Sequence, residues 1–423
     1  MTAEAEPKFR RIRRSASQAN LESRHQGREG RMLENALRTP PQGREGYSLT
    51  HGLHPYPARF HPNLPRTILK WLAQEHGDPP RLCDPFMGGG TLLVESLCRG
   101  WEVTGNDINP IAALVARERC RSRLPKHAVM VWNALEFLQN EVERRRRDKI
   151  RVEHPHLSML KTHYQPHIFA EMLQWSDCLE QLYPGPDRDT LRFVFSSLVG
   201  KFSRRIEEGN DGEKKEKGNF PRGAFSLWMQ RKTREVLERQ QDLSRRLPDP
   251  KMRPQIWQQD VRELSLPQGC DPFDCLITSP PYPGTYDYLD HHRLRLRWLH
   301  FSIQELALKE IGTRRQHSAA QWKEVFRTCM LQMRQVTVSG GHCFLVLGDW
   351  VDQGHKTDAL EYVEKYADSV GWSVEGAASV RRPVYEEQLK EDFGESGRWE
   401  HLIWLRNQVQ ARPPSPIPTE EEE

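Results

Sequence analysis

The chain has 423 residues, enough for a large core and two lobes, and 28% of them are charged. No apolar run approaches the roughly 20 residues that a membrane-spanning helix needs, and the polar, Arg-rich N-terminus lacks the apolar centre of a signal peptide. The net charge of +4 is too small to indicate a nucleic-acid partner by itself. We therefore expect a soluble, cytoplasmic protein and argue against a membrane-spanning or secreted one.

Eight cysteines are spread along the chain without a Cys-x-x-Cys pair. In a chain of this length such spacing indicates neither a disulfide framework nor a zinc site. Cys270 and Cys275 are the nearest to a ligand pair, but Cys275 lies inside an apolar run that predicts a strand. We interpret the cysteines as buried thiols and predict no metal site.

The two ends of the chain show little hydrophobic periodicity. Residues 1–46 are rich in Arg, Gln, Ser and Gly, which predicts a flexible basic arm without a core of its own, with contact to nucleic acid as the alternative. Residues 411–423 combine four prolines with four glutamates and predict a disordered tail.

The first regular elements form a strand, a glycine turn, a helix and a second strand. Asp84 to Thr91 reads Asp-Pro-Phe-Met-Gly-Gly-Gly-Thr, an amphipathic run follows at 92–98, and Asp107 closes the next strand. Glycines at such a junction let the backbone approach a ligand, and a carboxylate after the second strand accepts hydrogen bonds from ribose hydroxyls. The pattern predicts a nucleoside-cofactor site.

The sequence lacks residues that some cofactor-binding motifs require, and this narrows the choice of cofactor. Thr91 follows Gly90 directly, whereas a P-loop needs a lysine there. Leu93 stands where a dinucleotide fingerprint has its third glycine, which disfavours NAD and FAD. A cofactor with ribose and adenine but no phosphate fits better.

Residues 121–254 have apolar side chains at spacings of three and four, which predicts a mainly helical insert too long for an ordinary crossover. Cations cluster within it, at residues 144–151, Arg204 and Arg205 among others, and Arg222, flanked by Phe220, Phe225 and Trp228, is a further candidate for a nucleic-acid contact, with a small aromatic core as the favoured alternative. Interleaved glutamates make any single cluster more typical of a solvated helix face. Taken together, we interpret the clusters as a surface that contacts phosphates and whose binding weakens as salt rises.

A rigid polar turn follows the apolar run 273–277. Pro280 and Pro281 fix the backbone and remove two donors, which leaves the carbonyls of Ser279 and Pro280 as acceptors beside the flat ring of Tyr282. This turn suits a planar group with an amino substituent, such as the edge of cytosine or adenine. The alternative is that the prolines only end a strand and Tyr282 packs under a loop.

Further strands are predicted at 256–261, 336–348 and, as an antiparallel pair, at 372–380 and 400–405, with a helix at 291–300. Tyr286 and Tyr288, just before this helix, are candidates for the wall of a base pocket, and Tyr288 alternatively begins the helix core. The elements together predict an α/β fold with one mostly parallel sheet and helices on both faces.

Two of these motifs, in this order, resemble those of the S-adenosylmethionine-dependent DNA amino methyltransferases. Asp84 to Thr91 is similar to the cofactor-binding motif of that family, and Ser279 to Tyr282 to its catalytic motif. His54 to Pro65 is similar to the segment that closes over the methionine end of the cofactor. The resemblance covers about Leu53 to Cys120 and the region from about Trp257 onwards, but not the middle or the termini.

This resemblance implies a Rossmann-like methyltransferase fold, with a cofactor-binding half at 47–120, an inserted target-recognition region at 121–254 and a catalytic half at 255–410. It implies S-adenosylmethionine as the cofactor. Residues implied to bind it are Phe60, Asp84, Pro85, Phe86, Gly88, Gly90, Thr91 and Asp107. Asp260 is implied to approach the adenine, and a role as a turn or helix-cap aspartate is an equal alternative.

The resemblance further implies methylation of the exocyclic amino group of a flipped base in double-stranded DNA, without a covalent enzyme intermediate. Ser279, Pro280, Pro281 and Tyr282 are the implied catalytic residues: the serine side chain and the Pro280 carbonyl accept the amine hydrogens while Tyr282 stacks on the ring. Serine favours cytosine N4, because adenine N6 enzymes of the family more often carry Asp or Asn there. Adenine N6 remains the alternative.

Two other classes share the fold. An RNA amino methyltransferase would more often carry Asn or Asp before Pro-Pro-Tyr, and a non-catalytic nucleic-acid-binding subunit would not need intact Gly88, Gly90, Ser279 and Tyr282. The resemblance also implies a bacterial or archaeal host and, as a partner, a restriction endonuclease or another defence-system protein.

Overall fold

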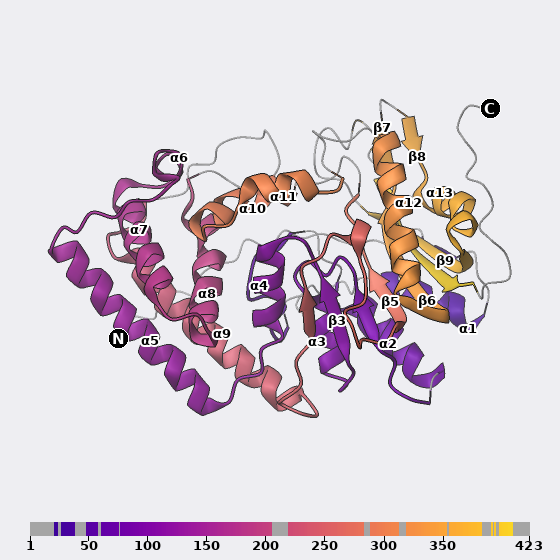
Figure 1. Cartoon of the computed structure of the whole chain (residues 1–423), viewed down its shortest axis with the longest axis horizontal. Coiled ribbons are helices and arrows are strands. Elements are labelled where there is room, and N and C mark those ends of the chain that lie inside the picture. Colours follow the sequence, from indigo (N-terminus) through magenta and orange to yellow (C-terminus); the bar gives the residue numbers. More distant parts are fainter. Residues whose placement is uncertain are drawn as a thin grey trace, which may run out of the picture.

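A computed structural model describes residues 21–23, 27–38, 48–57, 61–75, 77–204, 219–282, 288–312, 319–352, 355–382, 391, 393–394 and 397–408. Figure 1 shows a sheet on the right, a group of helices on the left and α4 between them. Within the described ranges, none of the helices combines the length and the apolar character needed to cross a membrane.

One eight-stranded sheet organises the right-hand part of the molecule. Its strands, in spatial order, are β1 (Leu21–Ser23), β9 (Trp372–Arg382), β10 (Arg398–Asn407), β6 (Thr337–Gly348), β5 (Phe273–Thr278), β2 (Leu82–Asp84), β3 (Val103–Asn106) and β4 (Gln255–Trp257). A separate hairpin pairs β7 (Trp350–Asp352) with β8 (His355–Thr357).

The direction of the strands defines the fold class. Strands β4, β3, β2, β5 and β6 are parallel neighbours, and β10 lies antiparallel between β6 and β9. The chain runs from β2 outwards to β3 on one side and later places β5 on the other side, so the order reverses between β2 and β5. Ligands bind at such a switch point, outside the carboxyl ends of the strands. The predicted Rossmann-like fold is confirmed.

Helices cover both faces of the sheet, because successive side chains of a strand point to opposite sides. Cys275 and Ile277 of β5 pack in one core with α1 (Arg28–Leu37), α2 (Asn63–Glu75) and α3 (Thr91–Leu97). The intervening Leu276 packs in the opposite core with α12 (Ala319–Gln335) and α13 (Ala359–Tyr366). We call this part the sheet lobe.

The sequence-based prediction of a coreless arm over residues 1–46 is wrong for two segments. Strand β1 pairs with β9, and α1 buries Met32, Leu33, Ala36 and Leu37 against the sheet. These four residues form an apolar stripe at helical spacing. The prediction overlooked it because it was based on the average composition of residues 1–46. The predicted tail at 411–423 lies outside the described residues.

A second core lies in the group of helices that we call the helical lobe. It comprises α5 (Pro125–Arg147), α6 (Leu157–Lys161), α7 (Pro166–Gln181), α8 (Pro186–Phe202) and α9 (Ala224–Arg246). The described residues of the predicted insert, 121–254, contain these helices and no strand. Trp175, Phe193 and Phe225 are among its fully buried side chains.

Helix α10 (Tyr288–Trp298) packs onto the helical lobe although it follows the catalytic turn in the chain. Its Trp298 is fully buried in the helical core and donates a hydrogen bond to the Tyr164 hydroxyl over 3.0 Å. Together with α11 (Ile303–Lys309), α10 runs across the top of the view in Figure 1. The two lobes are therefore joined above the carboxyl ends of the parallel strands.

Candidate active site

The two turns singled out in the sequence meet at the switch point of the sheet. The Thr278 hydroxyl, at the end of β5, donates to Oδ1 of Asp84, at the end of β2, over 2.7 Å. The backbone N–H of Phe86 donates to the same oxygen over 3.1 Å. The start of the catalytic turn is therefore tied to the start of the glycine turn.

Asp84 is fully buried, and its other oxygen, Oδ2, has no hydrogen-bond partner within the described part of the chain. Burial raises the pKa of this carboxyl from 3.8 to about 7, although the Thr278 hydroxyl and the Phe86 N–H both lower it. A buried acceptor without a donor is costly unless a ligand or water satisfies it. The site thus has room for one more donor, preferably cationic.

Asp107 holds the glycine turn in place from β3. Its Oδ2 accepts a hydrogen bond from the Gly88 N–H over 3.0 Å and its Oδ1 from the Asn109 N–H over 2.8 Å. Burial raises the pKa of Asp107 to about 6. Each carboxylate oxygen still has a second lone pair, so the group can accept hydrogen bonds from a ligand as well.

Two glycines of the turn are required by geometry. Gly90 has φ 72° as the N-cap of α3, and a Cβ atom there would lie 2.9 Å from the Ala116 Cβ of α4 (Pro110–Arg119). A Cβ atom at Gly89 would lie 2.2 Å from an Arg119 guanidinium nitrogen. The turn is therefore packed directly on α4.

Arg119 is a site residue that the sequence analysis missed. It is fully buried and donates to the Gly89 carbonyl over 2.8 Å and to the His54 carbonyl over 2.7 Å. It thereby ties the segment before the first parallel strand to the glycine turn. Its position in the last turn of a helix gave no signal for this role, since arginines are normally exposed.

A cavity opens where these elements converge. Among the residues predicted from the sequence it is lined by Pro85, Phe86, Gly88, Asp107, Asp260, Ser279, Pro281 and Tyr288. The sequence analysis missed other lining residues, which include Tyr56, Asn109, Leu306, Lys309 and Glu310. The last three belong to α11 or follow it, and helix α11 carries no motif that could have revealed them.

Several predicted residues do not line this cavity. Asp84, Gly90, Thr91 and Pro280 do not line it, and all four are buried beside it. Phe60, Arg205 and Tyr286 lie outside the described residues.

Tyr282 packs against the sheet rather than lining the cavity. Its hydroxyl lies 3.2 Å from the Ser279 hydroxyl, and the guanidinium of Arg398 lies 5.3 Å from its ring centroid. A Cβ atom at Gly348 would lie 3.1 Å from its ring, so the glycine at the end of β6 leaves room for it. Burial raises the pKa of Tyr282, which is therefore a neutral phenol in this structure.

The prolines of the turn are fixed as well, because the Trp322 indole N–H donates to the Pro281 carbonyl over 3.2 Å. One of the turn's carbonyls is thus already used inside the protein.

Asp260 has the helix-cap role that was one of the two alternatives from the sequence, and its approach to an adenine stays a prediction. It lines the cavity, and it also caps a short 3₁₀ helix at Val261–Glu263 through the N–H of Arg262. Burial raises its pKa, but the hydrogen bonds from the Arg262 side chain and backbone together bring it below its ordinary value. Its carboxylate is an ionised acceptor at the cavity wall.

The predicted nucleic-acid residues are dispersed. Tyr288 begins α10 at the cavity, whereas Arg204 is exposed at the end of α8 and Arg222 lines a separate groove before α9. The described structure does not bring these side chains together.

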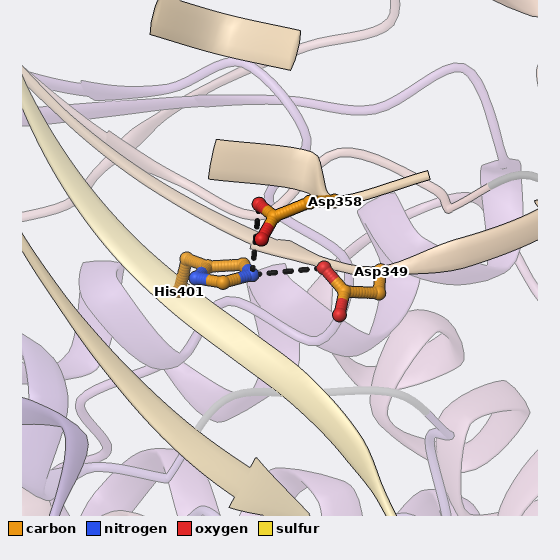
Figure 2. A group of neighbouring side chains, drawn as sticks. All are labelled: Asp349, Asp358 and His401. Atoms are coloured by element: carbon orange, nitrogen blue, oxygen red, sulfur yellow. Dashed lines mark hydrogen bonds and ion pairs between the residues drawn. The ribbon is translucent and has the colours of Figure 1, made fainter. Parts of the chain in front are cut away.

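A further cluster, unpredicted from the sequence, joins Asp349, Asp358 and His401 (Figure 2). His401 lies 2.9 Å from Asp349 and 3.9 Å from Asp358. Both aspartates accept backbone N–H groups at the start of α13, and Ser379 lies 2.8 Å from the other ring nitrogen of His401. The two aspartates therefore cap α13, and His401 and Ser379 tie this cap to β10 and β9.

Known proteins similar to this chain are type II methyltransferases. M.MvaI of Kocuria varians is 25% identical over 272 residues, which cover 61% of this chain and 59% of that protein. M.BsoBI of Geobacillus stearothermophilus is 26% identical over 287 residues, which cover 60% of this chain and 53% of that protein. The chain thus matches little more than half the length of each. No protein-family model matches.

A solved structure with overall likeness is the rRNA methyltransferase AviRa from Streptomyces viridochromogenes. It is 12% identical with a TM-score of 0.34, and the match covers 89% of this chain and 96% of that one. This likeness is too low to support a conclusion, so the fold rests on the strand order described above. The resemblance to methyltransferases that the two motifs predicted is nevertheless confirmed by the type II methyltransferases to which this chain is similar.

Proposed function

We propose that this protein is an S-adenosylmethionine-dependent DNA methyltransferase that modifies an exocyclic amino group, with cytosine N4 as the favoured target. One observation carries the proposal: the glycine turn and the Ser-Pro-Pro-Tyr turn meet at the switch point through the bond between Thr278 and Asp84. Residues of the predicted cofactor motif and of the predicted catalytic turn also line one cavity, which supports the proposal.

The residues present fit this cofactor. The buried, unpartnered Oδ2 of Asp84 would accept from the ammonium of its methionine part, and a cationic donor there would lower the raised pKa of the carboxyl. Asp107 would accept from the ribose hydroxyls and Asp260 from the adenine amino group. When bound, the cofactor supplies an activated methyl group on a sulfonium.

The catalytic turn would hold and orient the target. The Ser279 side chain lines the cavity and would accept one hydrogen of the amine, and the Pro280 carbonyl the other, which turns the nitrogen lone pair outwards. Tyr282 would have to leave its contact with Arg398 in order to stack on the base. Serine at position 279 supports cytosine over adenine.

Double-stranded DNA is the proposed substrate, since M.MvaI and M.BsoBI are named type II methyltransferases. A separate restriction endonuclease is the corresponding proposed partner. The location would be the cytoplasm of a bacterium or archaeon.

Incubation with methyl-labelled cofactor and either duplex DNA or RNA tests the substrate class. We expect label in DNA only, and a nucleoside digest followed by mass spectrometry should then yield N4-methylcytosine. N6-methyladenine would refute the cytosine assignment alone. Label in RNA only, or no cofactor binding in calorimetry, would contradict the proposed function.

A further inference from the structure

A basic groove lies in the helical lobe, apart from the cavity of the candidate active site. Its cationic lining residues are Arg145, Arg146, Arg147, Lys149 and Arg222, and its acidic one is Glu143. The groove shares no residue with the cavity between β2 and β5. It is formed where the end of α5, the start of α7 and the segment before α9 come together.

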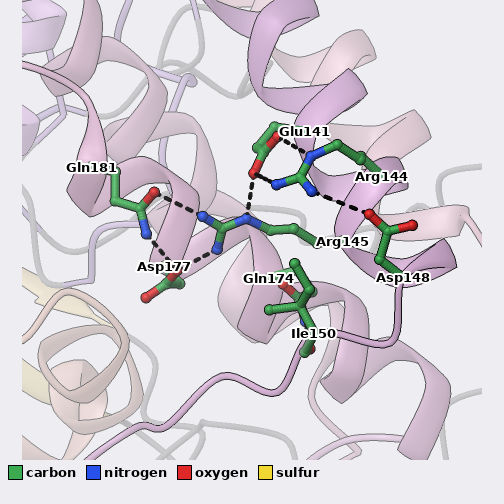
Figure 3. Close-up of polar contacts among 8 residues, drawn as sticks. All are labelled: Glu141, Arg144, Arg145, Asp148, Ile150, Gln174, Asp177 and Gln181. Carbon is green, nitrogen blue, oxygen red and sulfur yellow. Dashed lines mark hydrogen bonds and ion pairs between the residues drawn. The ribbon is translucent and has the colours of Figure 1, made fainter.

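One of the cations is structural and fixes the shape of the groove. Arg145 donates to Glu141 over 2.6 Å, to Asp177 over 2.5 Å and to Gln181 over 2.7 Å, which joins α5 to α7 (Figure 3). Gln174 of α7 donates to the Ile150 carbonyl over 2.8 Å and holds the turn after α5. This wall of the groove is therefore braced by α7.

The opposite wall is braced in the same way. The His167 ring lies 2.7 Å from the Phe220 carbonyl, and the Gln165 side chain bonds to Asn219 over 2.9 Å and to the Phe220 N–H over 3.1 Å. Arg222 follows two residues later and is exposed. Its backbone is thus presented from a fixed segment.

Four cations face the groove without a side-chain partner in the described part of the chain: Arg146, Arg147, Lys149 and Arg222. Only Glu143 opposes them at the lining, so the groove carries an excess of positive charge. Arg144, by contrast, bonds to Glu141 and Asp148 (Figure 3) and does not line the groove. An arginine-rich helix end alone would be explained by the helix dipole, but that does not explain Arg222, which comes from another segment.

Lys149 adds an independent observation. It has φ 53°, a conformation that glycine adopts far more easily, at the position after the C-cap of α5. The Ile150 N–H bonds to the Arg145 carbonyl and the Lys149 N–H to the Arg146 carbonyl, the pattern in which glycine is most common. A lysine held here at a conformational cost suggests a role for its charge.

We propose that this groove binds the phosphate backbone of the DNA duplex outside the base being modified. The proposal rests on the proposed function for the identity of the nucleic acid. Positive charge from two walls suits a polyanion, and contacts to phosphates strengthen binding without reading sequence. The groove would thus position the duplex, while the cavity between β2 and β5 selects the base.

The test is a salt titration of binding between the full-length protein and a 30-base-pair duplex. Arg147→Gln/Arg222→Gln, with one change on each wall, should weaken binding by about tenfold or more in low salt and reduce the log–log salt slope by about 2. Arg144→Gln is the control, because it removes one positive charge from a paired arginine on the helix of Arg147. It should leave the slope unchanged. Equal effects of the control and the double variant would overturn the proposal.

Lys149→Gly separates binding from structure. Glycine relieves the backbone strain, so we expect a slightly higher melting temperature together with a salt slope smaller by about 1. A purely structural role would leave DNA binding unchanged, and that result would contradict the proposal for Lys149.

The two proposals fail differently. In methyl transfer, Arg147→Gln/Arg222→Gln should raise KM for DNA and leave kcat at saturating DNA unchanged. If the double variant methylated DNA with an unchanged KM, the proposed role of the groove would be refuted and the proposed function would stand. If DNA binding depended on the groove but the wild-type protein transferred no methyl group, the proposed function would be refuted and the role of the groove would stand. No binding of duplex by the wild-type protein would overturn both.

Discussion

Two buried polar clusters, one in the helical lobe and one at the switch point of the sheet lobe, differ in their hydrogen bonding. In the helical lobe, Arg123 donates to Gln240 over 2.7 Å and to Thr190 over 2.6 Å, and Gln240 in turn bonds to Glu118. At the switch point of the sheet, Asp84 is just as buried but keeps one oxygen unpartnered. A satisfied network stabilises structure, whereas an unsatisfied group marks the place where a ligand is expected.

The carboxyl groups differ between the lobes as well. At the switch point of the sheet lobe, the pKa values of Asp84 and Asp107 are raised by burial to about 7 and about 6. In the helical lobe, the hydrogen bonds from Arg144 and Arg145 lower the pKa of Glu141 to about 2 (Figure 3). The first arrangement is suited to chemistry on a bound molecule, and the second to holding helices and displaying the remaining cations.

The largest expected effect tests the unpartnered carboxyl. The folded pKa of Asp84 is about 7 and its ordinary value 3.8, so the folded state binds the extra proton between these pH values and loses stability as pH rises. Asp84→Asn keeps an acceptor for Thr278 and Phe86 but carries no charge. Between pH 5 and pH 8 the wild type should therefore lose about 3 kcal/mol in free energy of unfolding relative to Asp84→Asn.

Urea denaturation at both pH values, without cofactor, measures this difference. Parallel pH profiles of the two proteins would mean that Asp84 is not strained by burial, and the contrast with the helical lobe would lose its main support. Addition of S-adenosylmethionine should narrow the gap at pH 8, because only the wild type gains an ionic partner for the carboxylate.

A second test compares two glycines with similar backbone conformation. Gly90 precedes α3 with φ 72° and is packed on Ala116, whereas Gly223 precedes α9 with φ 81° and a Cβ atom there would meet nothing within 4 Å. Alanine at either position incurs the cost of the left-handed conformation, about 1 kcal/mol. Gly90→Ala adds a clash and should cost about 2–3 kcal/mol in total.

Thermal and urea unfolding of both variants checks the difference. If Gly223→Ala destabilised the protein as much as Gly90→Ala, the close packing of Gly90 on α4 would contribute nothing to stability beyond the cost of the backbone conformation. We also expect Gly90→Ala to weaken cofactor binding, since the turn lines the cavity through Gly88.

The same comparison explains what the sequence could predict. Asp84 to Thr91 and Ser279 to Tyr282 are local signals, in which prolines, glycines and a following acid fix the chemistry within a few residues. The strands β2, β3, β5 and β6 and the antiparallel pair β9 and β10 accordingly lie close to their predicted positions.

Contacts between distant segments could not be predicted in this way. Arg119 bonds to His54 and Gly89, which lie 65 and 30 residues away in the sequence. Helix α11 contributes to the cavity only because of how the lobes pack, and no local sequence pattern predicts this. Helix α1 was missed because a short apolar stripe lies in a polar segment. The insert was expected to be helical from its spacing, but the groove depends on how α5, α7 and α9 meet.

Removal of the Tyr282 ring should affect turnover and spare the cofactor. Loss of a stacking ring costs about 1–3 kcal/mol, so Tyr282→Ala should lower kcat by about 10- to 100-fold. The cofactor Kd should stay the same, because Tyr282 does not line the cavity beside Gly88, Asp107 and Asp260. Full activity in this variant would refute the stacking role, and a matching loss of cofactor affinity would show that the ring only supports the fold beside Arg398.

The smallest effect separates the two hydroxyls of the catalytic turn, which lie 3.2 Å apart at Ser279 and Tyr282. If Ser279 accepts a hydrogen of the target amine, Ser279→Ala should lower kcat by about five- to tenfold, the value of one hydrogen bond, and Tyr282→Phe by less. If the serine only bonds to the tyrosine, both single variants and the double variant should show the same loss. The double-mutant cycle in kcat thus decides whether this turn acts on a substrate, as the cavity of the sheet lobe suggests, or is a closed hydrogen-bond network like that of Arg123 and Gln240.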